Sequence, residues 1–282
     1  MFRINVLIAG LASVTALVAA AGALAISNGV PDENRHPNVG MLAVEIDGKR
    51  FINCSGSYAG ARKNASGTGV FLTAGHCVAW MPEAGIDPSQ LWVTFDTAAS
   101  FDSATGEVVG ATNWYRANGF AFDPEFGHDH ANAKDYAVVL LATTVAGLTA
   151  VQLPTAGQLD DIAARGGLRP GAVFDNVGYG VIPGHKQGPP RFTAPPGRMF
   201  STSFFQGLTK SWLKLLMNSD ARGGGNGGIC IGDSGSPKFI HGTNTVVAVS
   251  TGGDAVCRAE NFNQRIDVAD ARAFLGQYLN LP

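Results

Sequence analysis

Charged side chains are scarce in this chain of 282 residues. Asp, Glu, Lys and Arg make up 15% of it and the formal net charge is −2, whereas charged residues are about 25% of an average globular domain. A chain so close to neutrality has no electrostatic basis for binding nucleic acid or an anionic membrane, so we expect neither partner. Glycine is instead abundant, with 37 residues. Together with many short Val, Ile, Phe and Tyr runs, this composition favours a loop-rich all-β protein.

Metal-binding spacings are also lacking. No C-x-x-C or H-x-x-x-H pattern occurs in the sequence, which disfavours a zinc site. His128, Asp129 and His130 come closest to a metal-binding pair, and a solvated loop tip is the competing interpretation of these residues. We therefore expect no metal and no cofactor.

Only one stretch is apolar enough to span a bilayer, and it lies at the N-terminus. Arg3 precedes an alanine-rich apolar run that ends near Ile26, and Ala23-Leu24-Ala25 has the small-x-small form of a signal-peptidase site. The pattern predicts a secretory signal peptide over residues 1–25. An uncleaved membrane anchor is the alternative, because the run is longer than usual. We expect a secreted, extracellular protein without membrane contact after cleavage.

Cysteines number only four: Cys54, Cys77, Cys230 and Cys257. An even count in a secreted chain favours disulfides. Three pairings are open, and the pairing of sequence neighbours would join the first two cysteines and the last two. Each of these bridges would close a loop of about 25 residues, worth about 3–4 kcal/mol in the loop-entropy model.

Short apolar runs recur along the rest of the chain, without a repeat at a fixed period. The segments that predict strands are 39–46, 50–52, 55–58, 69–74, 91–95, 136–141, 173–181, 199–205, 213–217 and 245–251. We assign no strand to the polar, glycine-spotted segment 96–134. A short helix is predicted at 158–165, and the stretch Asp267-Val268-Ala269-Asp270 is expected to cap a terminal helix. Two strand-rich halves followed by one helix favour a pair of antiparallel barrels.

Three motifs far apart in the sequence carry the chemistry. Thr73-Ala74-Gly75-His76-Cys77 ends a predicted strand on a histidine and a cysteine, and Asp135 directly precedes the apolar run 136–141. Cys230-Ile231-Gly232-Asp233-Ser234-Gly235-Ser236-Pro237 places a serine among glycines. Such a turn can aim a hydroxyl and several N–H groups at one point, as acyl transfer requires.

These motifs resemble those of the chymotrypsin-like (trypsin-fold) serine peptidases. That family's blocks read T/S-A-A/G-H-C, D-I-A-L-L and G-D-S-G-G/S-P, in the same chain order. The resemblance covers nearly all of the chain after residue 25. It implies an all-β fold of two antiparallel six-stranded β-barrels with a C-terminal α-helix, the first barrel over residues 26–155 and the second over residues 156–282. It also favours the disulfides between sequence neighbours.

The resemblance further implies a serine endopeptidase that works through an acyl-enzyme. Ser234 would be the nucleophile and His76 its base, since imidazole titrates near neutrality. Asp135 would fix the histidine tautomer, and the backbone N–H groups of Gly232 and Ser234 would form the oxyanion hole. Polypeptide substrates and protein protease inhibitors are the implied partners, and we expect a monomer.

Other positions imply how substrate is held. Ser250, Thr251 and Gly252 match the family's S-W-G strand, which pairs with extended substrate backbone. Thr251 replaces the usual aromatic residue, and Ser250 is expected to bond Asp135 as well.

Specificity is implied by the residues around the serine block. Trypsin-type members carry an aspartate six residues before the serine, where this chain has Gly228 beside the apolar Ile229. We expect an apolar or aromatic residue at P1, the substrate position before the scissile bond. Lysine would be tolerated if Glu260 points inward, and the alternative is that Glu260 faces solvent.

Maturation is the last implied property. The family usually begins I-V-G-G after cleavage, and the new ammonium pairs with the aspartate before the serine. Ile26-Ser27-Asn28-Gly29 stands in that place here, directly after the predicted signal peptide. Signal cleavage would then release Ile26 to pair with Asp233. Alternatively, Asp233 bonds only backbone or an internal side chain.

Two other functions compete with that of an endopeptidase. One is a catalytically silent, secreted polypeptide-binding homologue, against which the intact triad argues. The other is an esterase that uses the same serine.

Overall fold

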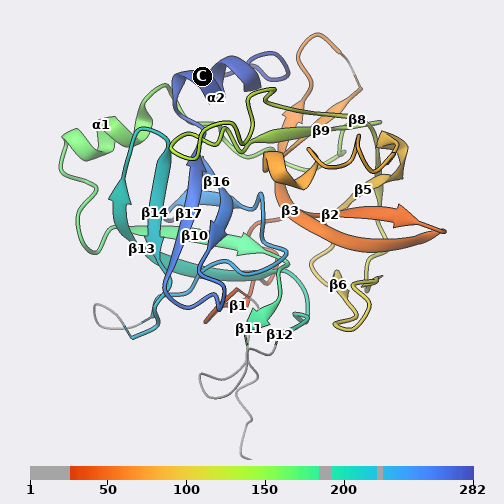
Figure 1. Ribbon diagram of the computed structural model, residues 1–282, viewed down its shortest axis with the longest axis horizontal. Helices are drawn as coiled ribbons and strands as arrows, with labels where there is room; N and C mark the ends of the chain where they lie inside the picture. The colour runs from red at the N-terminus through yellow and green to blue at the C-terminus, as the bar shows by residue number, and fades with distance from the viewer. Residues whose placement is uncertain (1–25, 66, 184–191, 221–224) are drawn as a thin grey trace, which may run out of the picture.

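Antiparallel strands dominate the computed structural model (Figure 1). The structure describes residues 26–65, 67–183, 192–220 and 225–282. The predicted signal peptide lies outside these residues. No helix in the described ranges is both long enough and apolar enough to cross a membrane.

Six strands close the first barrel in the order β2-β3-β4-β9-β8-β5. They are β2 (Val39–Ile46), β3 (Lys49–Ala61), β4 (Gly69–Thr73), β5 (Leu91–Thr94), β8 (Tyr115–Phe122) and β9 (Ala137–Leu141). β2 and β3 form a hairpin whose turn residues Asp47 and Gly48 both have positive φ, as the Asp-Gly pair predicts. Fully buried side chains, among them Leu42, Phe71 and Val139, fill the barrel.

Six further strands close the second barrel, in the order β13-β10-β15-β16-β17-β14 with β14 returning to β13. They are β10 (Val173–Gly178), β13 (Met199–Leu208), β14 (Trp212–Leu216), β15 (Pro237–Ile240), β16 (Val246–Gly253) and β17 (Glu260–Arg265). The short strand β1 (Val30–Pro31) extends this sheet by pairing with β13. The all-β, two-barrel architecture predicted from the sequence is confirmed.

The remaining described elements are short. Two ribbons are formed by β6 (Ser100–Phe101) with β7 (Val108–Val109) and by β11 (Ile182–Pro183) with β12 (Phe192–Thr193). The helical elements are η1 (Gly75–Cys77), η2 (Pro88–Gln90), α1 (Gln158–Ala164) and α2 (Ala269–Leu275). Both α-helices lie where the sequence predicts them.

Three strands of the barrels, β8, β15 and β17, escaped prediction for a common reason, which is that polar residues interrupt them. Segment 96–134, for which the sequence supports no strand assignment, contains β8, which completes the first barrel. β15 contains a lysine, and β17 reads Glu-Asn-Phe-Asn-Gln-Arg. In β17 the barrel buries polar side chains that hydrogen-bond within it, as when Asn263 donates to the Leu213 carbonyl at 3.0 Å.

α2 begins within the stretch 267–270 that was expected to cap it, but neither aspartate of this stretch provides a side-chain cap. Val268 occupies the N-cap of α2 and makes no side-chain cap hydrogen bond. The Asp267 carboxylate instead accepts from the Arg265 guanidinium at 2.9 Å and from the backbone N–H of Leu159 at 2.8 Å. Arg265 is almost fully buried and requires a counter-charge, so it takes the carboxylate away from α2 and turns it toward the first turn of α1.

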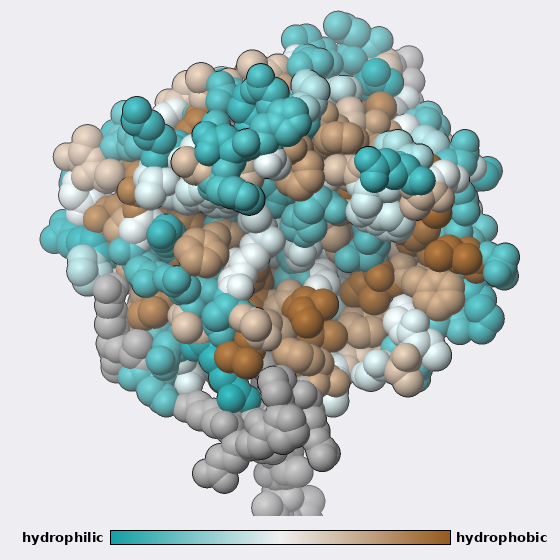
Figure 2. Space-filling view, in the orientation of Figure 1, coloured by the Kyte–Doolittle hydropathy of each residue, from teal (hydrophilic) through white to brown (hydrophobic). Residues whose placement is uncertain are grey.

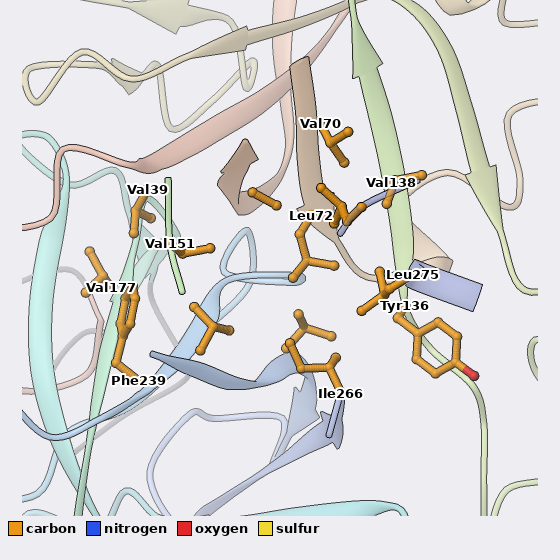
Figure 3. Close-up of a cluster of buried hydrophobic side chains, with 14 of the residues drawn as sticks. Val39, Val70, Leu72, Tyr136, Val138, Val151, Val177, Phe239, Ile266 and Leu275 are labelled. Carbon is orange, nitrogen blue, oxygen red and sulfur yellow. The ribbon is translucent and has the colours of Figure 1, made fainter. Parts of the chain in front are cut away.

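A hydrophobic cluster joins the two barrels and α2 (Figure 3). Val70, Leu72 and Val138 enter it from the first barrel, Val177 and Phe239 from the second. α2 adds Phe274, whose ring lies 5.4 Å from that of Tyr136. The outer surface is mixed, and on the face shown in Figure 2 hydrophilic side chains cover much of the upper part while hydrophobic ones gather over the lower centre and right.

A buried arginine adds a polar connection between the barrels. Arg198, only 1% exposed, donates to the Asp32 carboxylate at 2.9 Å and to the carbonyls of Val39 at 3.1 Å and Phe95 at 3.0 Å. The same guanidinium donates to the Tyr179 hydroxyl at 3.2 Å. One side chain therefore ties the N-terminal segment to both barrels.

Candidate active site

Strand pairing brings His76 and Asp135 together. β4 and β9 are antiparallel neighbours in which Thr73 faces Ala137, so η1 after β4 lies beside the residues that precede β9. Asp135 is fully buried and accepts from His76 twice, at 2.8 Å from the ring Nδ1 and at 2.8 Å from the backbone N–H. An ionised Asp135 holds the proton on Nδ1, which leaves Nε2 as the basic nitrogen of the ring.

The Ser234 turn packs directly on the histidine strand. Gly235 has φ +76, and a Cβ there would lie 2.0 Å from Thr73 Oγ1 and 2.6 Å from the Ala74 nitrogen. Ser55 on β3 donates its backbone N–H to the Ser234 carbonyl at 2.9 Å. The absence of a side chain at Gly235 therefore lets the second barrel place its serine against the end of β4.

His76 and Ser234 line one cavity of about 440 Å³, together with Ile229, Gly232 and Gly252. Within the described part of the chain the Ser234 hydroxyl makes no hydrogen bond to the His76 ring. Catalytic hydrogen bonds are often loose in a site without substrate and tighten when substrate binds. The exposed side chain of Ile231 also lines this cavity and offers an apolar surface to a ligand.

Two N–H groups of the turn are available to a ligand. The backbone nitrogens of Gly232 and Ser234 donate to no acceptor among the described residues. The Gly232 carbonyl is instead held by the Ser55 hydroxyl at 2.9 Å. Gly232 has φ +95, a conformation that glycine adopts readily. The sequence did not single out Ser55, because a serine within a predicted strand carries no motif.

Asp233 anchors the turn from the inside. Its carboxylate is fully buried and accepts from the backbone N–H groups of Gly180 at 2.8 Å and Cys230 at 2.9 Å. A Cβ at Gly178 or Gly180 would lie 2.1 Å or 2.5 Å from the carboxylate oxygens, so both positions require glycine. Burial raises the pKa of the Asp233 carboxyl, and the backbone hydrogen bonds and the Lys238 ammonium lower it in opposition.

Ile26 lies in a separate buried cluster with Ile182 and Met199. No hydrogen bond joins it to Asp233 in the described ranges. Next to it, Ser27 forms an isolated bridge with Gly228 of the second half. The ion pair between a released Ile26 ammonium and Asp233 stays a prediction.

Both predicted disulfides are present, Cys54–Cys77 and Cys230–Cys257. The first ties β3 to η1 beside His76, and the second ties the serine block to the loop after β16. The sulfurs of the first bridge lie close to the His76 ring, but as a disulfide they offer no thiolate to a metal. His128, Asp129 and His130 are exposed, as a loop tip would be.

Gly228, the central predicted specificity position, packs against uncharged side chains. A Cβ at Gly228 would lie 2.2 Å from Met217 Cγ and 3.0 Å from the amide nitrogen of Asn261. Met217 is 1% exposed and follows β14, which pairs with β17. The sequence did not identify Met217 or Asn261, since only the pairing of β14 with β17 brings them under Gly228.

The predicted substrate strand lies in β16, with a β-bulge between Ser250 and Gly252. The Ser250 hydroxyl pairs with the Ser236 hydroxyl at 2.7 Å, and the expected bond to Asp135 is not among the described hydrogen bonds. Thr251 is half-buried. Glu260 lies opposite Leu216 at the start of β17, and whether its carboxylate reaches a substrate stays a prediction.

Two closed six-stranded antiparallel barrels, with a histidine and an aspartate from one and a serine turn from the other, fit a chymotrypsin-like fold. No protein-family model matches the chain, and no curated protein matches it. The fold and the residues of the site therefore carry the functional argument.

Proposed function

We propose that this protein is a secreted serine endopeptidase that cleaves polypeptides through an acyl-enzyme. The observation that carries the proposal is the shared cavity of His76 and Ser234, with the buried Asp135 carboxylate 2.8 Å from His76 Nδ1. The two disulfides are consistent with export. A binding protein without activity would have no requirement for this arrangement of base, carboxylate and nucleophile.

The reaction follows from these groups. His76 Nε2 takes the hydroxyl proton of Ser234 as its oxygen attacks the scissile carbonyl carbon, and the Asp135 carboxylate stabilises the imidazolium that forms. The N–H groups of Gly232 and Ser234 stabilise the oxyanion. His76 then gives the proton to the leaving amine, and water, deprotonated by the same ring, hydrolyses the ester to release the acid and restore Ser234.

The substrate preference that we propose is an apolar P1 residue. Ile229 and Ile231 supply apolar wall to the cavity, and Asp254 is the acidic residue of its lining. Beside the cavity, the uncharged Met217 packs against Gly228, the position where trypsin-type members carry an aspartate. The edge of β16 at Gly252 borders the cavity and would pair with extended substrate backbone.

The test uses secreted protein with a fluorophosphonate probe and two substrates. An endopeptidase becomes labelled and hydrolyses casein. Labelling with hydrolysis of a simple acetate ester alone would show an esterase instead, and the absence of labelling would show a binding protein. The Ser234→Ala variant is the control for contaminating hydrolases.

A further inference from the structure

The ammonium of Lys238 is an unexpected group in the interior. Lys238 lies on β15 and is fully buried. Its Nζ has no hydrogen-bond partner among the described residues. Burying an ammonium without a partner charge is costly, and lysine is almost never fully buried unless paired. Its burial therefore calls for a negative charge nearby.

Asp233 is placed to supply that charge. Lys238 pairs with Asn176 on β10, and the Asp233 carboxylate lies against Gly178, two residues further along the same face of that strand. Asp233 lies a few residues upstream on the same segment and is as fully buried as Lys238. Its two hydrogen bonds from Gly180 and Cys230 come from neutral backbone groups, so they leave a net negative charge in the interior. Burial lowers the pKa of the Lys238 ammonium, and the attraction of Asp233 raises it in opposition.

The backbone of β15 is irregular at this lysine. The register between β15 and β16 shifts between Lys238 and Phe239, which marks a β-bulge. A bulge re-aims side chains, and Pro237, Lys238 and Phe239 are all buried in succession, in contrast to the alternation of a regular strand with one solvent face. The lysine thus lies at the end of the segment that Asp233 begins, with Ser234 between them.

We propose that Lys238 is a positioning residue, whose ammonium is the counter-charge of Asp233 and holds the Gly232–Ser234 turn in its observed conformation. Its role in catalysis rests on the proposed function, but the ion pair itself does not. The pair makes the turn independent of the chain terminus. A chain that keeps residues before Ile26 would then carry a formed site, without activation by a new N-terminal ammonium.

A double-mutant cycle on thermal unfolding tests the pair without reference to activity. Lys238→Met removes the charge and keeps the length, and Asp233→Asn removes the opposite charge. Each single variant should lower Tm by about 10 °C, because it leaves one buried charge unpaired. The decrease in Tm of the double variant should be clearly smaller than the sum of the decreases of the two single variants. Lys210→Met, at an exposed lysine, should leave Tm unchanged.

Additive decreases in Tm across the cycle, or an unchanged Tm in Lys238→Met, would overturn the proposal. If Lys238→Met alone does not fold, a folded double variant supports the pair and an unfolded one overturns it.

The rate of fluorophosphonate labelling tests positioning. Lys238→Met should lower the rate by about 10²-fold, the effect of losing an oxyanion donor, but should change it little in the Asp233→Asn background. A chain with one extra alanine before Ile26 should react as fast as one that begins at Ile26. Slowing of the extended chain to the level of Lys238→Met would assign the counter-charge to the terminus and overturn the proposal. If the parent protein is not labelled, the proposed function fails, while the unfolding cycle still decides the ion pair.

Discussion

At the scale of single residues, the proposed chemistry depends on which nitrogen of His76 carries its proton. Asp135→Asn keeps the size of the side chain but presents an amide, which can donate to Nδ1 and turn the proton to Nε2. We expect kcat to fall by about 10⁴-fold with little loss of stability. The measurement is peptide hydrolysis, with the exposed Asp129→Asn as a matched control. A variant that keeps a tenth of the parent activity would contradict the role of Asp135.

Met217 packs against Gly228, next to Ile229 of the cavity wall, and we expect it to limit the depth available to a substrate side chain. Met217→Ala removes the side chain packed against Gly228 and should raise kcat/KM for large aromatic P1 residues, relative to small apolar ones, by about 10-fold or more. The fully buried Met41→Ala in the first barrel should show a similar loss of stability, about 2–5 kcal/mol. Met41→Ala should leave the P1 preference unchanged. A P1-varied peptide library makes the comparison, and an equal preference in the two variants would remove Met217 from the specificity argument.

The residues that the sequence identified and those that it missed differ in physical kind. His76, Asp135, Ser234 and the cysteines stand in local motifs, so their roles could be predicted from the order of residues along the chain. Lys238 could not be, because lysine usually lies at the surface and only the packing of the barrel shows that it is buried.

At the scale of elements, the contact between the serine turn and β4 decides where the nucleophile lies. A Gly235→Ala variant places a Cβ 2.0 Å from Thr73 Oγ1 in a backbone conformation with φ +76. We expect it to displace the turn and to lower activity by at least about 10²-fold, as misplacement of a reacting group by about 1 Å does.

Gly242→Ala is the matched control for that variant. Gly242 has φ +70, but nothing lies within 4 Å of its added Cβ. This variant should lose about 1–2 kcal/mol of stability from backbone strain alone and keep its activity. Equal effects of the two variants on peptide hydrolysis would show that strain, not contact with β4, matters at Gly235.

Strands made of consecutive apolar residues could be predicted from the sequence. Strands whose polar side chains hydrogen-bond to one another inside the barrel could not. β2 was predicted with its observed bounds, since eight mostly apolar residues precede an Asp-Gly turn. β17 is half amide side chains, whose hydrogen-bond partners become visible only when β14 lies beside it.

At the scale of the whole molecule, Arg198 joins the barrels whose junction forms the site. Arg198→Met would leave Asp32 buried without its counter-charge and should lower the free energy of unfolding by about 3–5 kcal/mol. The exposed Arg169→Met should change it by less than about 0.5 kcal/mol. Denaturant unfolding measures both, and equal midpoints would contradict the role of Arg198.

Acid should weaken the ion pair between Asp32 and Arg198. Burial raises the pKa of the Asp32 carboxyl, but its hydrogen bonds with His36 and the charge of Arg198 outweigh burial and hold that pKa below its usual value of 3.8. The stability that Asp32 contributes is therefore fully present above pH 3.8 and is lost as the pH falls through the lower, folded value.

The proposed reaction requires that Ser234 is a nucleophile activated by His76. The most direct measurement is the stoichiometry and position of fluorophosphonate labelling, read by mass spectrometry of the intact protein and of its peptides. We expect one label per molecule, located on Ser234, and very slow labelling of His76→Ala. A label on another serine, or rapid labelling of His76→Ala, would contradict it.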